Sequence, residues 1–72
     1  MSGHEFRVFL ALRPIRGGRW IAEWVVRGTG GTLYKSKPCA TEAGALALAR
    51  RYLAKRPDML DTTPADRFPV AP

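Results

Sequence analysis

The chain has 72 residues, of which 12 are Lys or Arg and 6 are Asp or Glu, and its hydrophobic content is 46%. This length allows one small domain with a modest core, and the single cysteine, Cys39, excludes an intrachain disulfide. No apolar stretch approaches the roughly 20 residues of a membrane-spanning helix, so we expect a soluble, cytoplasmic protein without membrane attachment.

Two β-strands are predicted in the first part of the chain. In residues 6–13 and again in residues 19–27, the even positions are apolar, whereas the charged residues occupy odd positions. This alternation is typical of strands with one buried face. Residues 14–18 supply turn chemistry through Pro14, Gly17 and Gly18. We therefore expect the following residues to face the core: Phe6, Val8, Leu10, Leu12, Trp20, Ala22, Trp24 and Val26.

A third strand and a helix are predicted next. Residues 28–31 are rich in glycine and precede a weaker strand over residues 32–37, which ends at Pro38. Thr41 is a suitable N-cap for a helix that runs to Lys55, because Glu42 lies in its first turn and basic residues lie in its last turns. Its apolar stripe has spacings of three and four: Ala45, Leu46, Ala49, Tyr52 and Leu53.

The composition changes at Pro57. Residues 1–57 carry 11 basic and 3 acidic residues, whereas residues 58–72 carry three Asp and one Arg among several prolines. Proline opposes both a continuous helix and a central strand. We therefore predict a domain over 1–57 and an acidic, Pro-rich, partly disordered tail over 58–72, in which Thr63 and Pro64 suit the start of one helical turn. Whether the tail folds onto the domain stays open.

The predicted fold class is α+β. Short connections between the strands favour antiparallel neighbours, so we expect a three-stranded antiparallel sheet with one C-terminal helix packed on one face. The other face of the sheet is then left without a covering helix.

The sequence offers no constellation that indicates catalysis. His4 has no carboxylate or second ligand near it, and Cys39 has no partner histidine or second cysteine. The segment 28–31 leads into a strand and lacks the Gly-Lys-Ser/Thr sequence of a phosphate loop. We expect a non-enzymatic binding module with no metal site and no cofactor.

The face of the sheet opposite the helix mixes arginines with apolar residues. Guanidinium groups bind phosphate or guanine in a bidentate way, and a two- or three-stranded ribbon fits the major groove of DNA. The predicted nucleic-acid-binding residues are Arg7, Arg13, Arg16, Arg19, Arg27, Lys35 and Lys37. The alternative is a protein interface with an apolar centre formed by Phe9, Ile21 and Val25.

The order of three strands and a helix resembles the β-β-β-α domains that read DNA through a sheet. These are the arm-type domains of phage tyrosine integrases and the domains of plant ethylene-responsive factors. The resemblance covers about 50 residues as a topology, and it implies groove contacts from Arg7, Arg19, Arg27 and Lys35.

The segments 18–23 and 41–43 are also similar to the N-terminal part of HicB-type antitoxins. The Pro-Gly-Cys segment usual before the third strand of those proteins is missing, and the strong positive charge is unusual for them.

We therefore expect the ligand to be a nucleic acid, and among nucleic acids we expect duplex DNA. The alternative is a protein partner, bound by an antitoxin-like protein or by a phage or mobile-element protein that inhibits a host or toxin protein. Homodimerisation through the outer face is compatible with both hypotheses.

Overall fold

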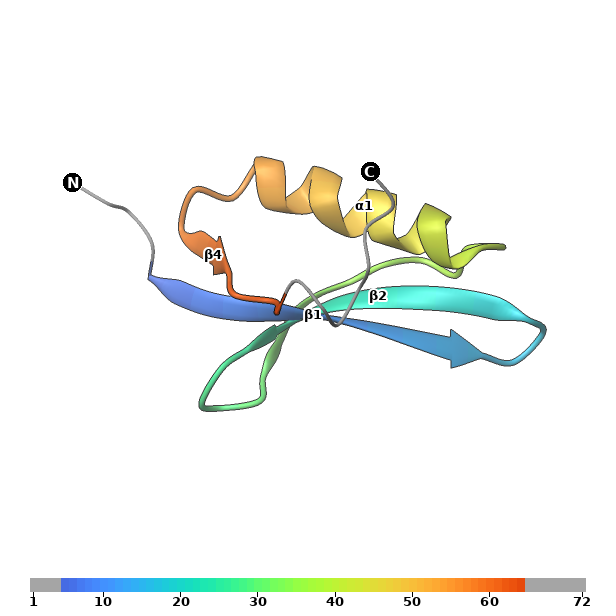
Figure 1. Ribbon diagram of the computed structural model, residues 1–72, viewed down its shortest axis with the longest axis horizontal. Coiled ribbons are helices and arrows are strands. Elements are labelled where there is room, and N and C mark those ends of the chain that lie inside the picture. The colour runs from blue at the N-terminus through green and yellow to red at the C-terminus, as the bar shows by residue number, and fades with distance from the viewer. Residues whose placement is uncertain (1–4, 65–72) are drawn as a thin grey trace.

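One helix packs on one face of a four-stranded sheet in the computed structural model, which describes residues 5–64 (Figure 1). The elements follow in the order β1 (Phe6–Ile15), β2 (Arg19–Val26), β3 (Thr32–Lys35), α1 (Glu42–Ala54) and β4 (Met59–Asp61). In space the strands are ordered β3-β2-β1-β4, and β4 runs parallel to β1. The α+β class is confirmed, but the expectation of three antiparallel strands is wrong.

The β1–β2 hairpin is the longest paired unit. Its register places Leu10 opposite Trp24 and Leu12 opposite Ala22, so the apolar even positions of both strands share one face. The turn uses Gly17 and Gly18 at φ values of 84° and 71°, which glycine adopts without steric cost. The hairpin therefore forms where the alternation of the sequence predicts it.

β1 extends beyond its predicted end and includes Pro14. This residue lies opposite Trp20, whose N–H and C=O groups are both bonded to Cys39 on the other side of β2. The nitrogen of Pro14 therefore faces away from β2, where no ladder bond is needed. Since β4 pairs only with Phe6 to Val8, that side of β1 is an edge at Pro14, and an edge tolerates proline.

The core lies between the sheet and α1. Its buried residues are Val8, Leu10, Ala22, Trp24, Ala45, Ala49 and Met59. Trp24 is 1% exposed, and its indole Nε1 donates a hydrogen bond to the Ala49 carbonyl oxygen at 2.8 Å. The prediction that the even-numbered face of the hairpin packs against the helix is confirmed.

The helix begins as its sequence predicts. The Thr41 hydroxyl accepts a hydrogen bond of 3.0 Å from the Gly44 backbone N–H, and Glu42 lies in the first turn. Such a cap satisfies one of the free N–H groups at the start of a helix. β3, in contrast, ends at Lys35 instead of Lys37, although the Ser36 backbone N–H still donates to Ala22.

β4 is the element that the sequence pattern did not predict. Residues 59–61 pair with residues 6–8 of β1, and Met59 is buried at 3% exposed. The next residues continue along β1, because the Thr62 N–H donates to the Val8 carbonyl and the Leu10 N–H donates to the Thr63 hydroxyl. The sheet therefore crosses the boundary expected near Pro57. The rest of the predicted tail, residues 65–72, lies outside the described residues.

Candidate nucleic-acid interface

The sheet face turned away from α1 carries the odd-numbered residues of β1 and β2. No helix or strand within residues 5–64 covers this face, as Figure 1 shows. We call it the outer face. It is formed by the residues Arg7, Phe9, Ala11, Arg13, Ile15, Arg19, Ile21, Glu23 and Val25, with Arg27 after the end of β2.

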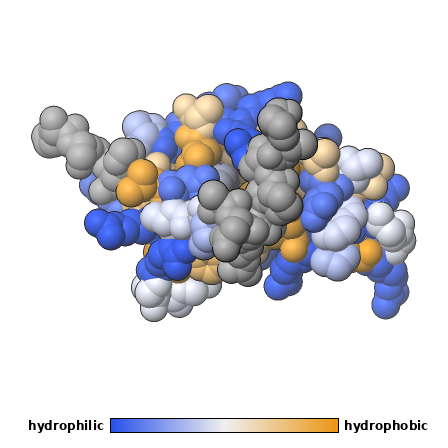
Figure 2. Space-filling view, viewed as in Figure 1, coloured by the Kyte–Doolittle hydropathy of each residue, from blue (hydrophilic) through white to orange (hydrophobic). Residues whose placement is uncertain are grey.

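Three predicted cations meet at the turn of the hairpin. Arg13, Arg16 and Arg19 are all exposed, and residues 13–19 form what we call the hairpin arm. Arg19 lies directly opposite Ile15, which follows Arg13 by about 7 Å along the strand. In Figure 2, hydrophilic side chains project away from α1 at the end of the molecule where the hairpin turns. The arm therefore presents three exposed arginines within seven residues of the chain.

Arg7 and Arg27 lie at the opposite end of the outer face. The Arg27 backbone N–H donates to the Arg7 carbonyl, which places the two residues side by side. The Arg27 guanidinium lies over Phe9, 5.1 Å from the ring centroid, and donates to the Thr62 hydroxyl and, at 3.0 Å, to the Thr62 carbonyl oxygen. Arg27 thus joins β2 to the segment after β4, whereas Arg7 is exposed.

Lys35 and Lys37 belong to a third location. Lys35 ends β3 and Lys37 follows it, and both are exposed. Glu23 lies opposite Lys35 on one side and Ala11 on the other, and it is 8% exposed. The predicted cations therefore form three groups around an outer face whose centre holds one acidic residue.

The residues of the alternative protein interface have unequal exposure. Phe9 and Val25 face each other across the hairpin and are half-buried, with Arg27 lying over the Phe9 ring. Ile21 is only 4% exposed. Among the described residues the exposed large apolar side chain is Leu60, at 37%, in β4.

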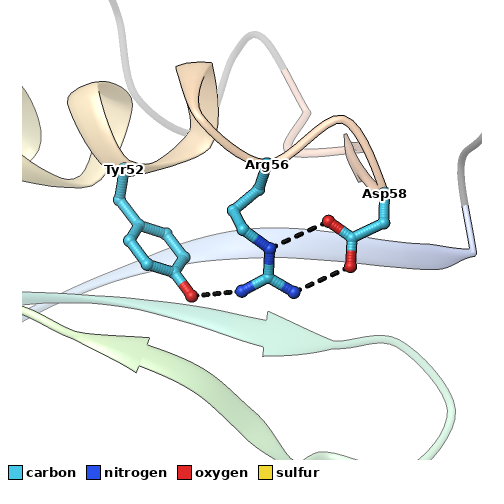
Figure 3. A network of polar contacts seen from close by, with 3 residues as sticks. All are labelled: Tyr52, Arg56 and Asp58. Carbon is cyan, nitrogen blue, oxygen red and sulfur yellow. Dashed lines mark hydrogen bonds and ion pairs between the residues drawn. The ribbon is translucent and has the colours of Figure 1, made fainter.

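Arg56 is held by a carboxylate at the end of α1. Its Nε and NH2 groups donate to the two carboxylate oxygens of Asp58 at 2.9 and 2.7 Å, and its NH1 group donates to the Tyr52 hydroxyl (Figure 3). These bonds from Arg56 lower the pKa of Asp58. Within residues 5–64 this is the one ion pair. The arginines of the hairpin arm are therefore not neutralised by any described carboxylate.

The Asp58 pair predicts a pH dependence of stability. Because the pKa of Asp58 is lower in the folded state, its stabilising contribution is present above the unfolded pKa and is lost as the pH falls through the folded pKa. We expect Asp58→Asn to lower the thermal midpoint at pH 7 and the difference from the native protein to close below about pH 4. Thermal melts across this range measure it, and a difference that persists unchanged at pH 2 would contradict it.

The described residues form no metal-binding cluster. Within residues 5–64 no group of three or more His, Cys, Asp or Glu side chains lies close enough to hold a metal ion. The Cys39 thiol is half-buried and donates to the Lys37 carbonyl oxygen at 3.4 Å. His4 lies outside the described residues. In the same part of the chain, α1 is too short and too polar to cross a membrane.

Sequence reasoning missed two sets of contacts, one beside the outer face and one between β3 and α1. No local sequence pattern predicts the hydrogen bonds of Thr62 and Thr63 to β1, since their partners Val8 and Leu10 are more than 50 residues away in the chain. The stacking of Tyr34 on Tyr52 joins two separate elements and was not predicted either.

Comparisons with protein-family models, with curated proteins and with solved structures found no match to this chain. The resemblances to sheet-type DNA-binding domains and to HicB-type antitoxins therefore stay predictions.

Proposed function

We propose that this protein is a non-enzymatic module that binds nucleic acid, duplex DNA first, through the hairpin arm and the outer face. The observation that carries this proposal is the gathering of three exposed arginines around one tight hairpin turn: Arg13 near the end of β1, Arg16 in the turn and Arg19 at the start of β2. Guanidinium groups bind phosphate and the guanine edge in a bidentate way. A two-stranded ribbon of this kind fits the major groove, which is about 12 Å wide.

The other cations have different roles in this proposal. Arg7 lies six residues before Arg13 on β1, which corresponds to about 20 Å along the strand. A duplex lying along the outer face then receives the arm in its major groove, and Arg7 contacts the phosphate backbone of the duplex. Lys35 and Lys37 add phosphate contacts at the β3 edge. The Arg27 guanidinium is bonded to Thr62 and lies over the Phe9 ring, so its contribution to DNA binding is smaller than those of the other cations.

Protein binding is the second proposed function. It is favoured by the facing pair Phe9 and Val25 and by the exposed Leu60, which lies opposite Arg7 in the pairing of β4 with β1. In this case apolar side chains form the centre of an interface and the arginines form its rim. The partner is then a second copy of this chain or a host or toxin protein.

A retardation assay separates the two functions. The full chain is titrated against duplex DNA, duplex RNA and single strands at two salt concentrations. We expect binding to duplex DNA at low salt that weakens steeply at higher salt, because each phosphate contact releases counterions. Failure to bind any of these nucleic acids at low salt, together with a stable complex with a protein partner or with itself, would favour the second function.

A further inference from the structure

A hollow lies between β3 and α1, away from the hairpin arm. Its volume is about 190 Å³, and it is lined by Tyr34, Leu48, Arg51, Tyr52 and Lys55. The rings of Tyr34 and Tyr52 are stacked, with centroids 4.2 Å apart and an angle of 18° between their planes. Pockets for small-molecule ligands commonly measure about 300 to 1,000 Å³. This hollow is therefore of a size for one side chain.

The charges around the hollow are all positive. Arg51 and Lys55 are exposed at its rim, and no acidic residue lines it. The carboxylate in the polar network of Figure 3, that of Asp58, is already paired with Arg56, whose guanidinium lies 5.4 Å from the Tyr52 ring centroid. Burial raises the pKa of Tyr34, so its hydroxyl stays neutral. The hollow thus combines an aromatic and aliphatic lining with cations that favour an acidic ligand.

The hollow lies beside a free sheet edge. β3 is the outermost strand of the sheet on this side. Tyr34 pairs with Trp24, and the Ser36 N–H donates to Ala22. In an antiparallel ladder every second residue bonds to the partner strand. The backbone N–H and C=O groups of Lys35, between these two, therefore point away from β2 and are available to an added strand.

We propose that an extended acidic segment of a partner protein adds to the β3 edge and inserts one apolar side chain into the hollow. Main-chain bonds to the edge supply affinity, and the side-chain pocket supplies specificity, as in other strand additions. Carboxylates on the same side of the segment as that apolar side chain then meet Arg51 and Lys55. The hollow and α1 lie on the other side of the sheet from the outer face, so the peptide and the nucleic acid share only the β3 edge, where Lys35 and Lys37 lie.

Two other occupants are less suitable. A second copy would bring its own Lys35 to the same edge, and the chain has 12 basic residues against 6 acidic ones, so like charges would meet. A nucleic acid lacks the backbone N–H and C=O pattern that pairs with a strand edge. An acidic peptide satisfies both the charges and the edge.

The test measures the fluorescence anisotropy of a labelled synthetic peptide, acidic at alternate positions with one central Phe, on titration with the full chain. The matched variants are Arg51→Glu, which alters the rim of the hollow, and Arg50→Glu, an adjacent exposed helix position outside it. We expect Arg51→Glu to weaken binding at least ten-fold and Arg50→Glu to weaken it less than three-fold. Replacing the central Phe by Ala, or methylating the peptide nitrogens, should also weaken binding at least ten-fold.

Several results would overturn this proposal. Equal weakening by both variants would indicate diffuse attraction, and unchanged affinity of the methylated peptide would exclude strand addition. A short duplex DNA that displaces the peptide from the native protein, but not from a variant lacking the arginines of the arm, would indicate competition at the arm instead. Self-association that Arg51→Glu abolishes would assign the hollow to a second copy.

Discussion

Replacing Trp24 by Ala is expected to reduce the free energy of unfolding by about 3 to 5 kcal/mol. Trp24 is the largest side chain in the core, at 1% exposed, and the substitution also removes the hydrogen bond from its indole to the Ala49 carbonyl. Stability of about 0.05 to 0.15 kcal/mol per residue gives a domain of this size roughly 4 to 10 kcal/mol in total. The variant should therefore be largely unfolded or close to it.

Urea unfolding followed by circular dichroism measures this loss. Trp20→Ala is the matched control, because Trp20 belongs to the same strand and face but is only half-buried. Trp24→Phe keeps most of the apolar volume and isolates the hydrogen bond, so it should be milder than Trp24→Ala. Equal losses from Trp20→Ala and Trp24→Ala would show that the core is not centred on Trp24.

Removing the three arginines of the hairpin arm is expected to weaken binding to duplex DNA by more than a hundred-fold. Each specific arginine contact to a duplex is worth about 1 to 3 kcal/mol, and every 1.4 kcal/mol is a factor of ten. The triple variant Arg13→Ala, Arg16→Ala and Arg19→Ala keeps Gly17 and Gly18, so the turn is preserved. Its three side chains are exposed, which predicts little change in stability.

The control variant removes the same charge from α1. It combines Arg50→Ala, Arg51→Ala and Lys55→Ala. These residues are exposed in α1 and at its C-cap, on the other side of the sheet from the outer face. Binding should fall by less than ten-fold in this variant, measured by fluorescence anisotropy at one fixed salt concentration. Equal losses from the two triple variants would mean that DNA is attracted by net charge alone.

The sequence carried enough information for the hairpin and the helix. Period-two alternation defines the buried face that contains Trp24, and the change to helical spacing after Pro38 marks α1. Both signals are local, since each depends on residues a few positions apart. The Thr41 cap is local in the same sense.

The features that the sequence did not reveal depend on distant contacts. β4 has three residues, too few for a periodic signal, and it forms because Met59 reaches the core beside Phe6. The charge of Arg27 is visible in the sequence and places it among the predicted binding cations, whereas its bonds to Thr62 are not visible there. The arm is a local feature, since Arg13, Arg16 and Arg19 flank the predicted turn, whereas the place of Lys35 depends on the pairing of β3 with β2.

The salt dependence of duplex DNA binding tests the central claim most directly. Each phosphate contact contributes about −0.9 to the slope of log affinity against log salt concentration. If Arg7, the three arginines of the hairpin arm, Lys35 and Lys37 all contact phosphates, the native slope is about −5.4, and the triple arm variant should flatten it to about −2.7. The same slope in the native protein and the arm variant would contradict the proposed interface.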